Sequence, residues 1–475
     1  MCRIISFFIV IVFFFSCKKE TFVTSGDARL SISIDTLKFD TVFTTVGSIT
    51  QSFKIRNDNN QKLRLNNIKL MGGASSSFQL NIDGQPTAIA SDLELAANDS
   101  LYIFVKIIIN QNTANLPFLV KDSIKIEFNG NTNWVQLQAY GQNARFLKNQ
   151  KITSNTTWNN QLPYVILGGL TVDTFATLTI DKGTKIYCSA NAPIIIHGTL
   201  KINGEKDTDD RVYFRGDRLD NDYKDLPGGW PGITFSNASK NNVMNFAVLK
   251  NAHQAIVTIG GATNIIPKLT LNECIIDNAY DIGLSAFSSS VNSRNCLFSN
   301  CGNNATLGEG GSNIILRGGG NYAFNYATIA TFGNIYTTHK QPVLYISNSG
   351  GASPAALSAI FKNSIIYGEG GLADDEIKTD KQGTTLFDVT LDNVLYKVKN
   401  ADPPNIRLLN NTTALKNQNP MFNTINILRN IYDFHLKPTS PCINKGTPIV
   451  GINFDLDGKI RTFGSSPDVG CYELQ

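Results

Sequence analysis

The densest group of ionisable residues lies in the stretch GDRLDNDYKD, which covers 216–225. It contains four aspartates, namely Asp217, Asp220, Asp222 and Asp225. Several carboxylates on one loop can bind Ca²⁺, because this hard cation prefers oxygen ligands. The spacing is not that of an EF-hand, and Arg218 and Lys224 lie inside the stretch and can neutralise its charge. A solvated loop is therefore the favoured interpretation, and a Ca²⁺ site is the alternative.

A second pair of carboxylates is Asp455 and Asp457 in the sequence DLDGKIR. An acid–base pair would need its two carboxylates to face each other across a sugar. Because Gly458 follows directly, a turn is more typical of this sequence than a strand. We interpret both aspartates as turn and cap residues, and we expect Arg461 to pair with Asp468.

A polysaccharide lyase or hydrolase needs a basic group beside carboxylates in a groove. The middle of the chain supplies such residues at scattered positions, namely Arg294, Arg317, Asp277, Asp281 and Glu309. Their spacing does not bring them together, so no catalytic residue is assigned. The four histidines are scattered and there is no CxxC pair, which argues against zinc.

The composition indicates a globular chain of several domains. A length of 475 residues is typical of about two to four domains. Charged residues make up only 17%, and the net charge is +4. No stretch combines basic residues with interleaved aromatics, so nucleic acid is not an expected partner.

The N-terminus has the layout of a secretory signal peptide over 1–16. Arg3 precedes an apolar run that ends before Ser16. As a helix this run would span about 18 Å, against about 30 Å for a hydrocarbon core, so it is short for a permanent span. Cys17 follows directly, as in the lipobox of bacterial lipoproteins, which this segment resembles. The sequence Lys18-Lys19-Glu20 is similar to the start of many lipoproteins of the Bacteroidota.

This resemblance implies that Cys17 becomes the lipid-bearing N-terminus and that 17–28 is a tether. The chain would then be an exported outer-membrane lipoprotein, on the periplasmic or cell-surface face, with the membrane as a partner through its acyl chains. The alternative is a plain signal peptide that leaves a soluble secreted protein.

Short segments with period-two alternation follow over 29–145, for example Ile124-Lys125-Ile126-Glu127-Phe128. Turn signals such as DNN, DG and NGN separate them. Many short strands at regular spacing predict a β-sandwich. The ending LQAYGQNA resembles the Ig-like domains that precede larger modules in Bacteroidota surface proteins.

The region 146–400 contains a repeated unit of apolar residues flanked by asparagine. Examples are NFAVLKN, NECIIDN, RNCLFSN, NYATIAT and KNSIIYG. The aligned residues are Leu249, Ile276, Phe298, Ile329 and Ile366, at steps of 27, 22, 31 and 37 residues. Such steps predict the coils of a right-handed parallel β-helix, the pectate-lyase-like fold, with loops inserted in the longer coils.

Two columns should fill the interior of these coils. The aligned residues form a large apolar column, and two positions earlier stand only small residues, namely Ala247, Cys274, Cys296, Ala327 and Ser364. Asn251, Asn278 and Asn300 fall just past the strands, where asparagine tolerates a left-handed turn. Their stacked side chains can hydrogen-bond along the helix.

The region 401–475 resembles a C-terminal segment found after such β-helices in bacterial surface proteins. The residues that carry this resemblance are NPMF, DFHLKPTSPCINKG, DLDGKIR and PDVGCYE. In the related pattern alanine usually stands at the positions of Cys442 and Cys471. Two cysteines there imply a disulfide that stabilises by about 3.5 kcal/mol, and two buried thiols are the alternative.

The sequence therefore predicts an all-β protein with an N-terminal β-sandwich, a right-handed parallel β-helix and a C-terminal cap. The expected function is that of a non-catalytic, lipid-anchored envelope protein that binds a polysaccharide or a surface protein through the β-helix. One alternative is a Ca²⁺-dependent lyase or hydrolase acting on acidic polysaccharide. A structural envelope component is the other.

Overall fold

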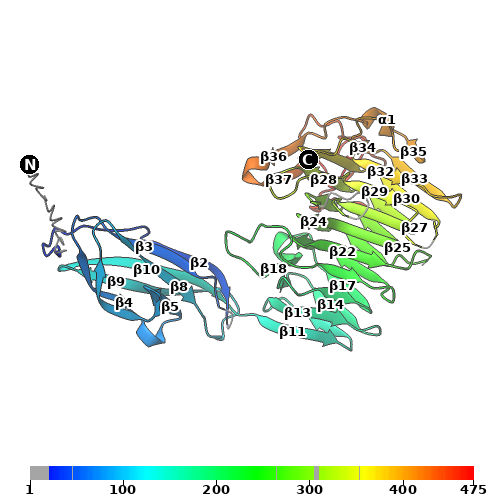
Figure 1. Ribbon diagram of the computed structural model, residues 1–475. Helices are drawn as coiled ribbons and strands as arrows, with labels where there is room; N and C mark the ends of the chain where they lie inside the picture. The colour runs from blue at the N-terminus through cyan, green and yellow to red at the C-terminus, as the bar shows by residue number, and fades with distance from the viewer. Residues whose placement is uncertain (1–20, 45–46, 264, 304–309, 352) are drawn as a thin grey trace, which may run out of the picture. The chain divides into compact units, whose positions relative to one another are not determined.

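The structure is a computed structural model that describes residues 21–44, 47–263, 265–303, 310–351 and 353–475 (Figure 1). The chain divides into two compact units, Met1–Gln142 and Asn143–Gln475. The expected signal peptide 1–16 and the lipid-bearing Cys17 lie outside the described residues. Within the described residues, no helix is long and apolar enough to cross a membrane.

The first unit is a sandwich of two five-stranded sheets in the described part of the chain. One sheet has the order β1 (Leu30–Ile32), β3 (Gln51–Asn57), β8 (Ser100–Ile107), β5 (Phe78–Ile82) and β6 (Gln85–Pro86). The other has the order β2 (Thr36–Phe43), β10 (Asn131–Gln142), β9 (Phe118–Phe128), β4 (Leu63–Leu70) and β7 (Ile89–Leu95). A short 3₁₀ turn, η1 (Gly73–Ser75), follows β4.

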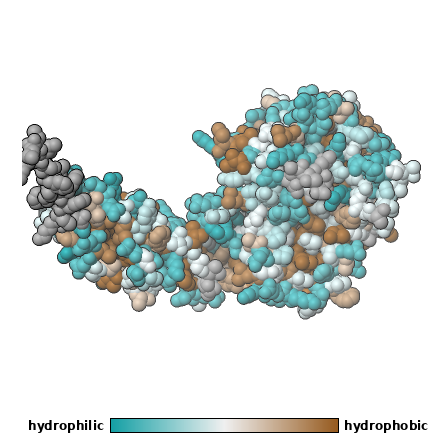
Figure 2. Space-filling model, in the orientation of Figure 1, coloured by the Kyte–Doolittle hydropathy of each residue, from teal (hydrophilic) through white to brown (hydrophobic). Residues whose placement is uncertain are grey.

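The sandwich core follows the period-two pattern of the sequence. Ile124 and Ile126 on β9 are fully buried, as the alternation predicts. On β10, Val135 and Leu137 are buried while Trp134 is 44% exposed. On the face visible in Figure 2, hydrophobic residues are interspersed with hydrophilic ones. The alternation therefore sorts the residues into a core side and a solvent side.

The second unit is a parallel β-helix whose strands form three faces (Figure 1). The first face contains β15 (Lys185–Cys188), β18 (Val212–Gly216), β21 (Ala247–Lys250), β24 (Ile275–Asp277), β26 (Leu297–Ser299), β28 (Thr328–Phe332), β31 (Ile365–Glu369) and β34 (Leu395–Tyr396). The second face contains β16 (Ile194–Ile196), β19 (Ile233–Phe235), β22 (Gln254–Ile259), β29 (Leu344–Ser347) and β32 (Ile377–Asp380).

The third face contains β12 (Thr156–Trp158), β14 (Thr177–Asp181), β17 (Thr199–Asn203), β20 (Asn242–Asn245), β23 (Leu269–Asn272), β30 (Leu357–Lys362), β33 (Phe387–Asp392) and β35 (Ile406–Leu409). Longer strands turn from one face into the next: β13 (Tyr164–Val172), β25 (Ile282–Arg294) and β27 (Ile314–Asn325). The first strand of the unit, β11 (Arg145–Ile152), pairs with β13, and the 3₁₀ turn η2 (Thr208–Asp210) lies before β18. These sheets confirm the expected all-β class.

The alignment of the repeated unit is confirmed residue by residue. Leu249 pairs with Ile276, which pairs with Phe298 in the next coil. Phe298 pairs with Ile329, which pairs with Ile366. All five side chains are 0% exposed, and the small residues two positions earlier are buried beside them. Repetition of an apolar residue beside a small one therefore fills the narrow coil interior.

Asparagines with a left-handed backbone form the corner between the first and second faces. They are Asn251, Asn278 and Asn300, with φ of 60°, 56° and 49°. Asn278 Nδ2 donates to Asn251 Oδ1 at 2.8 Å, so the expected side-chain ladder forms at this step. The prediction that asparagine turns the chain here is confirmed.

The C-terminal segment closes the last coil and then returns along the first face. The closing part is β35 with the short helix α1 (Thr412–Leu415). The returning part contains β36 (Phe422–Asn426), η3 (Ile427–Arg429) and β37 (Ile431–Leu436). Phe422, Phe434 and Cys471 pack on Leu297 and Ile365, the outward side chains of the first face. This segment therefore forms walls beside the coil corners.

Candidate functional site

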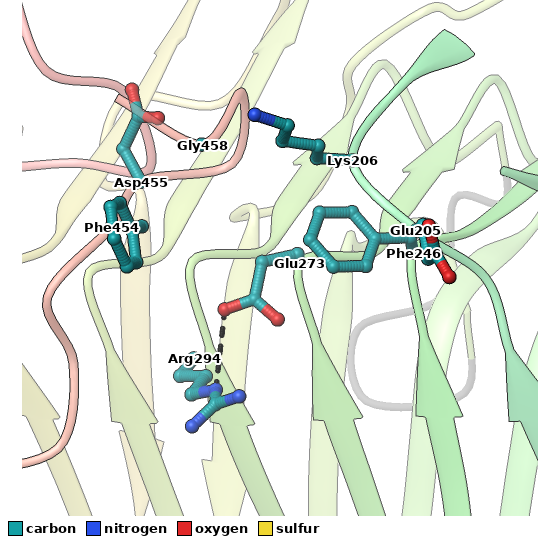
Figure 3. Close-up of a pocket in the computed structure, with 8 residues that line it drawn as sticks. All are labelled: Glu205, Lys206, Phe246, Glu273, Arg294, Phe454, Asp455 and Gly458. Atoms are coloured by element: carbon teal, nitrogen blue, oxygen red, sulfur yellow. Dashed lines mark ion pairs between the residues drawn. The ribbon is translucent and has the colours of Figure 1, made fainter. Parts of the chain in front are cut away.

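A cavity of about 470 Å³ lies between the C-terminal segment and the third-to-first corner of the β-helix (Figure 3). It is lined by Glu205, Lys206, Phe246, Glu273, Arg294, Phe454, Asp455 and Gly458. Ligand sites are concave, with apolar walls and a few polar groups. We call this cavity the corner pocket.

The third-to-first corner is a column of single residues in the left-handed region. Its members are Phe246, Glu273, Asn295, Tyr326, Asn363 and Asn393, with φ between 47° and 53°. This conformation costs an L-residue about 1–2 kcal/mol, and asparagine tolerates it best. Phe246, Glu273 and Tyr326 adopt this conformation without being asparagine, and Glu273 is the acidic residue among them. Strained residues cluster at functional sites, and Glu273 is therefore a candidate functional residue.

The Glu273 carboxylate is held by the neighbouring coil. Asn295 Nδ2 donates to its Oε1 at 2.9 Å, and Arg294 Nε lies 3.2 Å from the same oxygen. Burial raises the pKa of Glu273, and the contacts with Asn295 and Arg294 oppose that shift. Figure 3 shows the carboxylate between Arg294 and the Phe246 ring. Its Oε2 makes no hydrogen bond to the described residues and is available to a ligand.

Two cationic side chains, Arg294 and Lys206, line the corner pocket, and both have N–H groups that can donate to a ligand. Arg294 Nε is close enough to Glu273 for an ion pair, yet it makes no aligned hydrogen bond. The Arg294 side chain is 40% exposed. Among the described residues, neither its terminal nitrogens nor Lys206 Nζ has a partner. The pocket thus offers the free oxygen of Glu273, the largely exposed carboxylate of Glu205 and two positively charged donor groups.

The C-terminal wall supplies an exposed ring and a structural carboxylate. Phe454 is 54% exposed, while Asp455 is fully buried. Asp455 accepts the backbone N–H groups of Asp457 at 2.9 Å, Lys459 at 2.7 Å and Glu473 at 2.8 Å. These bonds occupy both oxygens of Asp455, which acts as a turn residue. From this wall, the ring of Phe454 and the backbone of Gly458 are left to contact a ligand.

The expected pairing of Arg461 with Asp468 is wrong. Arg461 Nη1 lies 3.4 Å from Glu473 Oε2. Asp468 instead accepts the backbone N–H groups of Asn444 and Leu474, each at 2.8 Å. The carboxylate of Asp468 therefore binds backbone N–H groups and does not pair with the guanidinium of Arg461.

The loop 216–225 does not bring its four aspartates together. Among the described residues, no group of three or more His, Cys, Asp or Glu side chains is placed to hold a metal ion. Arg218 donates to both oxygens of Asp220, at 2.7 and 3.0 Å, and so neutralises it. Burial raises the pKa of Asp217. Ca²⁺ binding by Asp217, Asp220, Asp222 and Asp225 stays a prediction from the sequence.

Of the scattered charged residues considered for catalysis, only Arg294 lines the corner pocket. Asp277 pairs with Lys250 at 3.2 Å on the first face, and Asp281 accepts from Gln254 at 2.7 Å. Glu309 lies outside the described residues. Glu273 was missed, although a signal was present. Comparison of NECIIDN with RNCLFSN puts Glu273 opposite Asn295 and exposes the substitution.

Cys442 and Cys471 are free thiols in the structure, buried in one apolar cluster on the first face. Burial raises the pKa of Cys442 to about 12 and moves that of Cys471 in the same direction. Neither thiol reacts readily in the folded protein, because the thiolate is the nucleophile. The expected disulfide between them is not formed in this structure and stays a prediction.

No family model matches the sequence, and no curated protein matches it. Several solved structures show slight similarity. A family 123 glycoside hydrolase from Clostridium perfringens is 9% identical, with a TM-score of 0.18, and the match covers 25% of this chain and 26% of that chain. The PapD-like domain 7 of human CEP192 is 10% identical, with a TM-score of 0.19, over 30% of this chain and 100% of that chain.

A protein of unknown function from Porphyromonas gingivalis W83 is 9% identical, with a TM-score of 0.18, over 26% of this chain and 59% of that chain. This chain therefore spans about a quarter of the hydrolase that it matches. All these similarities are too small to carry an argument about fold or function.

Proposed function

We propose that the protein is a lipid-anchored envelope protein that binds a glycan in the corner pocket. The observation that carries the proposal is the combination of two aromatic rings with a strained, buried carboxylate. Phe246 and Phe454 line the same pocket as Glu273 and Arg294. Sugar rings present apolar C–H faces and hydroxyl edges, which suit aromatic walls with convergent polar groups.

The hydrogen-bonding groups of the pocket include both acceptors and donors, as hydroxyl groups require. Glu273 Oε2 can accept from one hydroxyl, and the Arg294 guanidinium can donate to its neighbour. Charge-assisted bonds of this kind are stronger than neutral ones. Lys206 adds a further donor, and Figure 3 shows its side chain extending toward Gly458 of the C-terminal wall. A glycan segment therefore finds contacts on both walls.

The cellular part of the proposal rests on the N-terminus. Cys17 and the apolar run before it support export and lipidation, and the resemblance to Bacteroidota lipoproteins supports an outer-membrane location. In the same proposal, the sandwich of the first unit is an Ig-like spacer that follows the tether 17–28. A protein tethered this way meets the polysaccharides of the envelope or its surroundings.

A glycan array probed with the mature protein tests this function. The wild type should retain a limited set of glycans, and Glu273→Gln should lose signal on the same set. The glutamine keeps the side-chain shape and an oxygen for Asn295, so the fold is preserved. A wild type that binds no glycan, or a variant with an unchanged profile, would rule out the corner pocket as the site.

Glycan cleavage is a second candidate, favoured by the raised pKa of Glu273 beside Arg294. A carboxyl whose pKa is raised is a better general acid than an exposed one. Retained glycans should then be converted to products, with unsaturated ends that absorb in the ultraviolet if the reaction is elimination. A bound glycan that is recovered intact favours the non-catalytic role, and no binding at all favours a structural role.

A further inference from the structure

A second, smaller cavity of about 210 Å³ lies at the first-to-second corner of the β-helix. It is lined by Asp225, Lys250, Asn251, Asp277, Asn278, Asn300, Arg429, Asn430 and Tyr432. The coils supply the asparagine ladder and the Lys250–Asp277 pair, and the C-terminal segment supplies the residues from Arg429 to Tyr432. We call it the amide pocket. It shares no lining residue with the corner pocket.

The asparagine ladder is interrupted inside this cavity. Asn251 Nδ2 donates to Lys224 O at 2.6 Å, and Asn278 Nδ2 donates to Asn251 Oδ1 at 2.8 Å. One coil later, Asn300 Oδ1 instead accepts the backbone N–H of Phe332 at 3.2 Å. The described residues provide no partner for Asn278 Oδ1 or for Asn300 Nδ2. One free acceptor and one free donor therefore line the same cavity.

Asn300 has an amide donor that no other residue uses. The residue is 2% exposed in total, and its Nδ2 makes no hydrogen bond to the described residues where the side chain lines the pocket. A bound molecule can satisfy an unused donor of this kind. A ligand hydroxyl between Asn278 and Asn300 would accept from one amide and donate to the other. This hydroxyl would bridge the interruption in the ladder of asparagine side chains.

The charges of the amide pocket balance. Lys250 Nζ lies 3.2 Å from Asp277 Oδ2, so these two residues neutralise each other. The carboxylate of Asp225 and the guanidinium of Arg429 make no ion pair with the described residues. The wall thus carries two cations and two carboxylates. An anionic or cationic ligand would meet like charges, whereas a neutral ligand with hydroxyls can donate to the carboxylates and accept from the cations.

We infer that the amide pocket binds a single neutral sugar residue. Its volume is below the range of about 300–1,000 Å³ of drug-sized sites, so one ring fits better than a chain. Tyr432 adds an aromatic wall for the face of that ring. The inference is independent of the proposed function of the corner pocket, because the two cavities use different side chains.

Saturation-transfer NMR with the mature protein tests the inference. The neutral probes are the methyl glycosides of glucose, galactose and mannose, and the charged probes are galacturonate and glucosamine. At least one neutral glycoside should bind, and tighter than both charged sugars. Arg429→Gln and Asn300→Asp should each weaken its binding about tenfold, the usual effect of losing one charge-assisted or buried hydrogen bond.

The controls separate this site from others. Arg29→Gln removes an exposed arginine from the first unit and should leave binding unchanged. Phe454→Ala changes only the corner pocket and should also have no effect. Aspartate keeps the left-handed tolerance of Asn300, and an unchanged melting temperature shows that each variant folds. No neutral binding, preference for a charged sugar, or full binding by Arg429→Gln and Asn300→Asp would overturn the inference.

Discussion

Arg461 Nη2 donates to Asn295 Oδ1 at 2.7 Å across 166 residues of sequence. The same guanidinium lies 3.9 Å from the centre of the Tyr326 ring and donates to Gly470 O and Cys471 O, each at 3.0 Å. Asn295 and Tyr326 belong to successive coils of the third-to-first corner. Because Asn295 also donates to Glu273, Arg461 connects the C-terminal segment to the residue that defines the corner pocket.

Arg461→Ala should destabilise the second unit strongly. The side chain is 1% exposed, and its loss leaves Asn295 Oδ1 and the carbonyl oxygens of Gly470 and Cys471 without their charged donor. Each buried acceptor that is left unsatisfied costs about 1–3 kcal/mol. Equilibrium urea unfolding measures the change.

Arg407→Ala is the matched control for Arg461→Ala. Its guanidinium also pairs with a carboxylate, Asp388 at 2.8 Å, but its side chain is 63% exposed. Exposed pairs contribute about 1 kcal/mol or less. Equal losses in the two variants would show that burial of Arg461 does not matter.

The second unit should lose stability as the pH rises from weakly acid to weakly alkaline values. Burial raises the pKa of Glu473 from 4.5 to about 8, and it also raises the pKa values of Asp455 and Asp468. Between pH 4.5 and about 8 the folded protein keeps a proton on Glu473 that the unfolded chain releases. The free energy of unfolding therefore falls as pH rises through this window, and this contribution is lost above pH 8.

Thermal unfolding at a series of pH values checks this sign. The melting temperature should fall toward pH 8, and Glu473→Gln should flatten the profile. A melting temperature that rises with pH, or an unchanged slope in Glu473→Gln, would contradict the assignment.

Substitutions of Asn363 should show that the left-handed backbone at this corner determines which residues are stable there. Its φ is 52°, and its amide forms two bonds with the backbone of Thr447, Nδ2 to O at 2.8 Å and N–H to Oδ1 at 2.9 Å. Asn363→Ala and Asn363→Gly both lose these bonds, but only alanine is strained in this conformation. Alanine should therefore be about 1 kcal/mol less stable than glycine in urea unfolding. If glycine is no better, backbone strain is not what fixes this position.

Much of the β-helix was predictable because the same packing of residues that are close in sequence recurs from coil to coil. Leu249, Ile276 and Phe298 recur with small residues two positions earlier, and this spacing sets both strand register and interior. Asn278 marks its corner because few residues adopt φ near 56°. Each of these positions is determined by a few neighbours in sequence.

The site was less predictable because it depends on contacts between distant segments. Glu273 meets Asn295 through coil stacking, and Phe454 arrives from a segment that returns along the first face. Arg461 was expected to pair with Asp468, seven positions away, and instead binds Asn295. Local spacing cannot reveal such a partner, because it is brought close by the return of the chain.

Cys17→Ala should abolish lipid attachment. The proposal assigns the acyl chains to this cysteine, and alanine has no sulfur to carry them. Metabolic labelling with a fatty-acid precursor, followed by fractionation, measures the effect. The wild type should label and sediment with membranes, and the variant should do neither. A variant that still labels, or a wild type that never does, would leave a secreted protein.

The central claim is that the corner pocket binds a glycan, and titration calorimetry tests it most directly. A glycan retained by the wild type is titrated into wild type, Phe454→Ala and the control Phe175→Ala, which removes a phenylalanine that is 97% exposed at a turn of the β-helix. The account predicts that Phe454→Ala binds about tenfold more weakly, equivalent to ~1.4 kcal/mol, while Phe175→Ala matches the wild type. Equal affinity in all three proteins would contradict it.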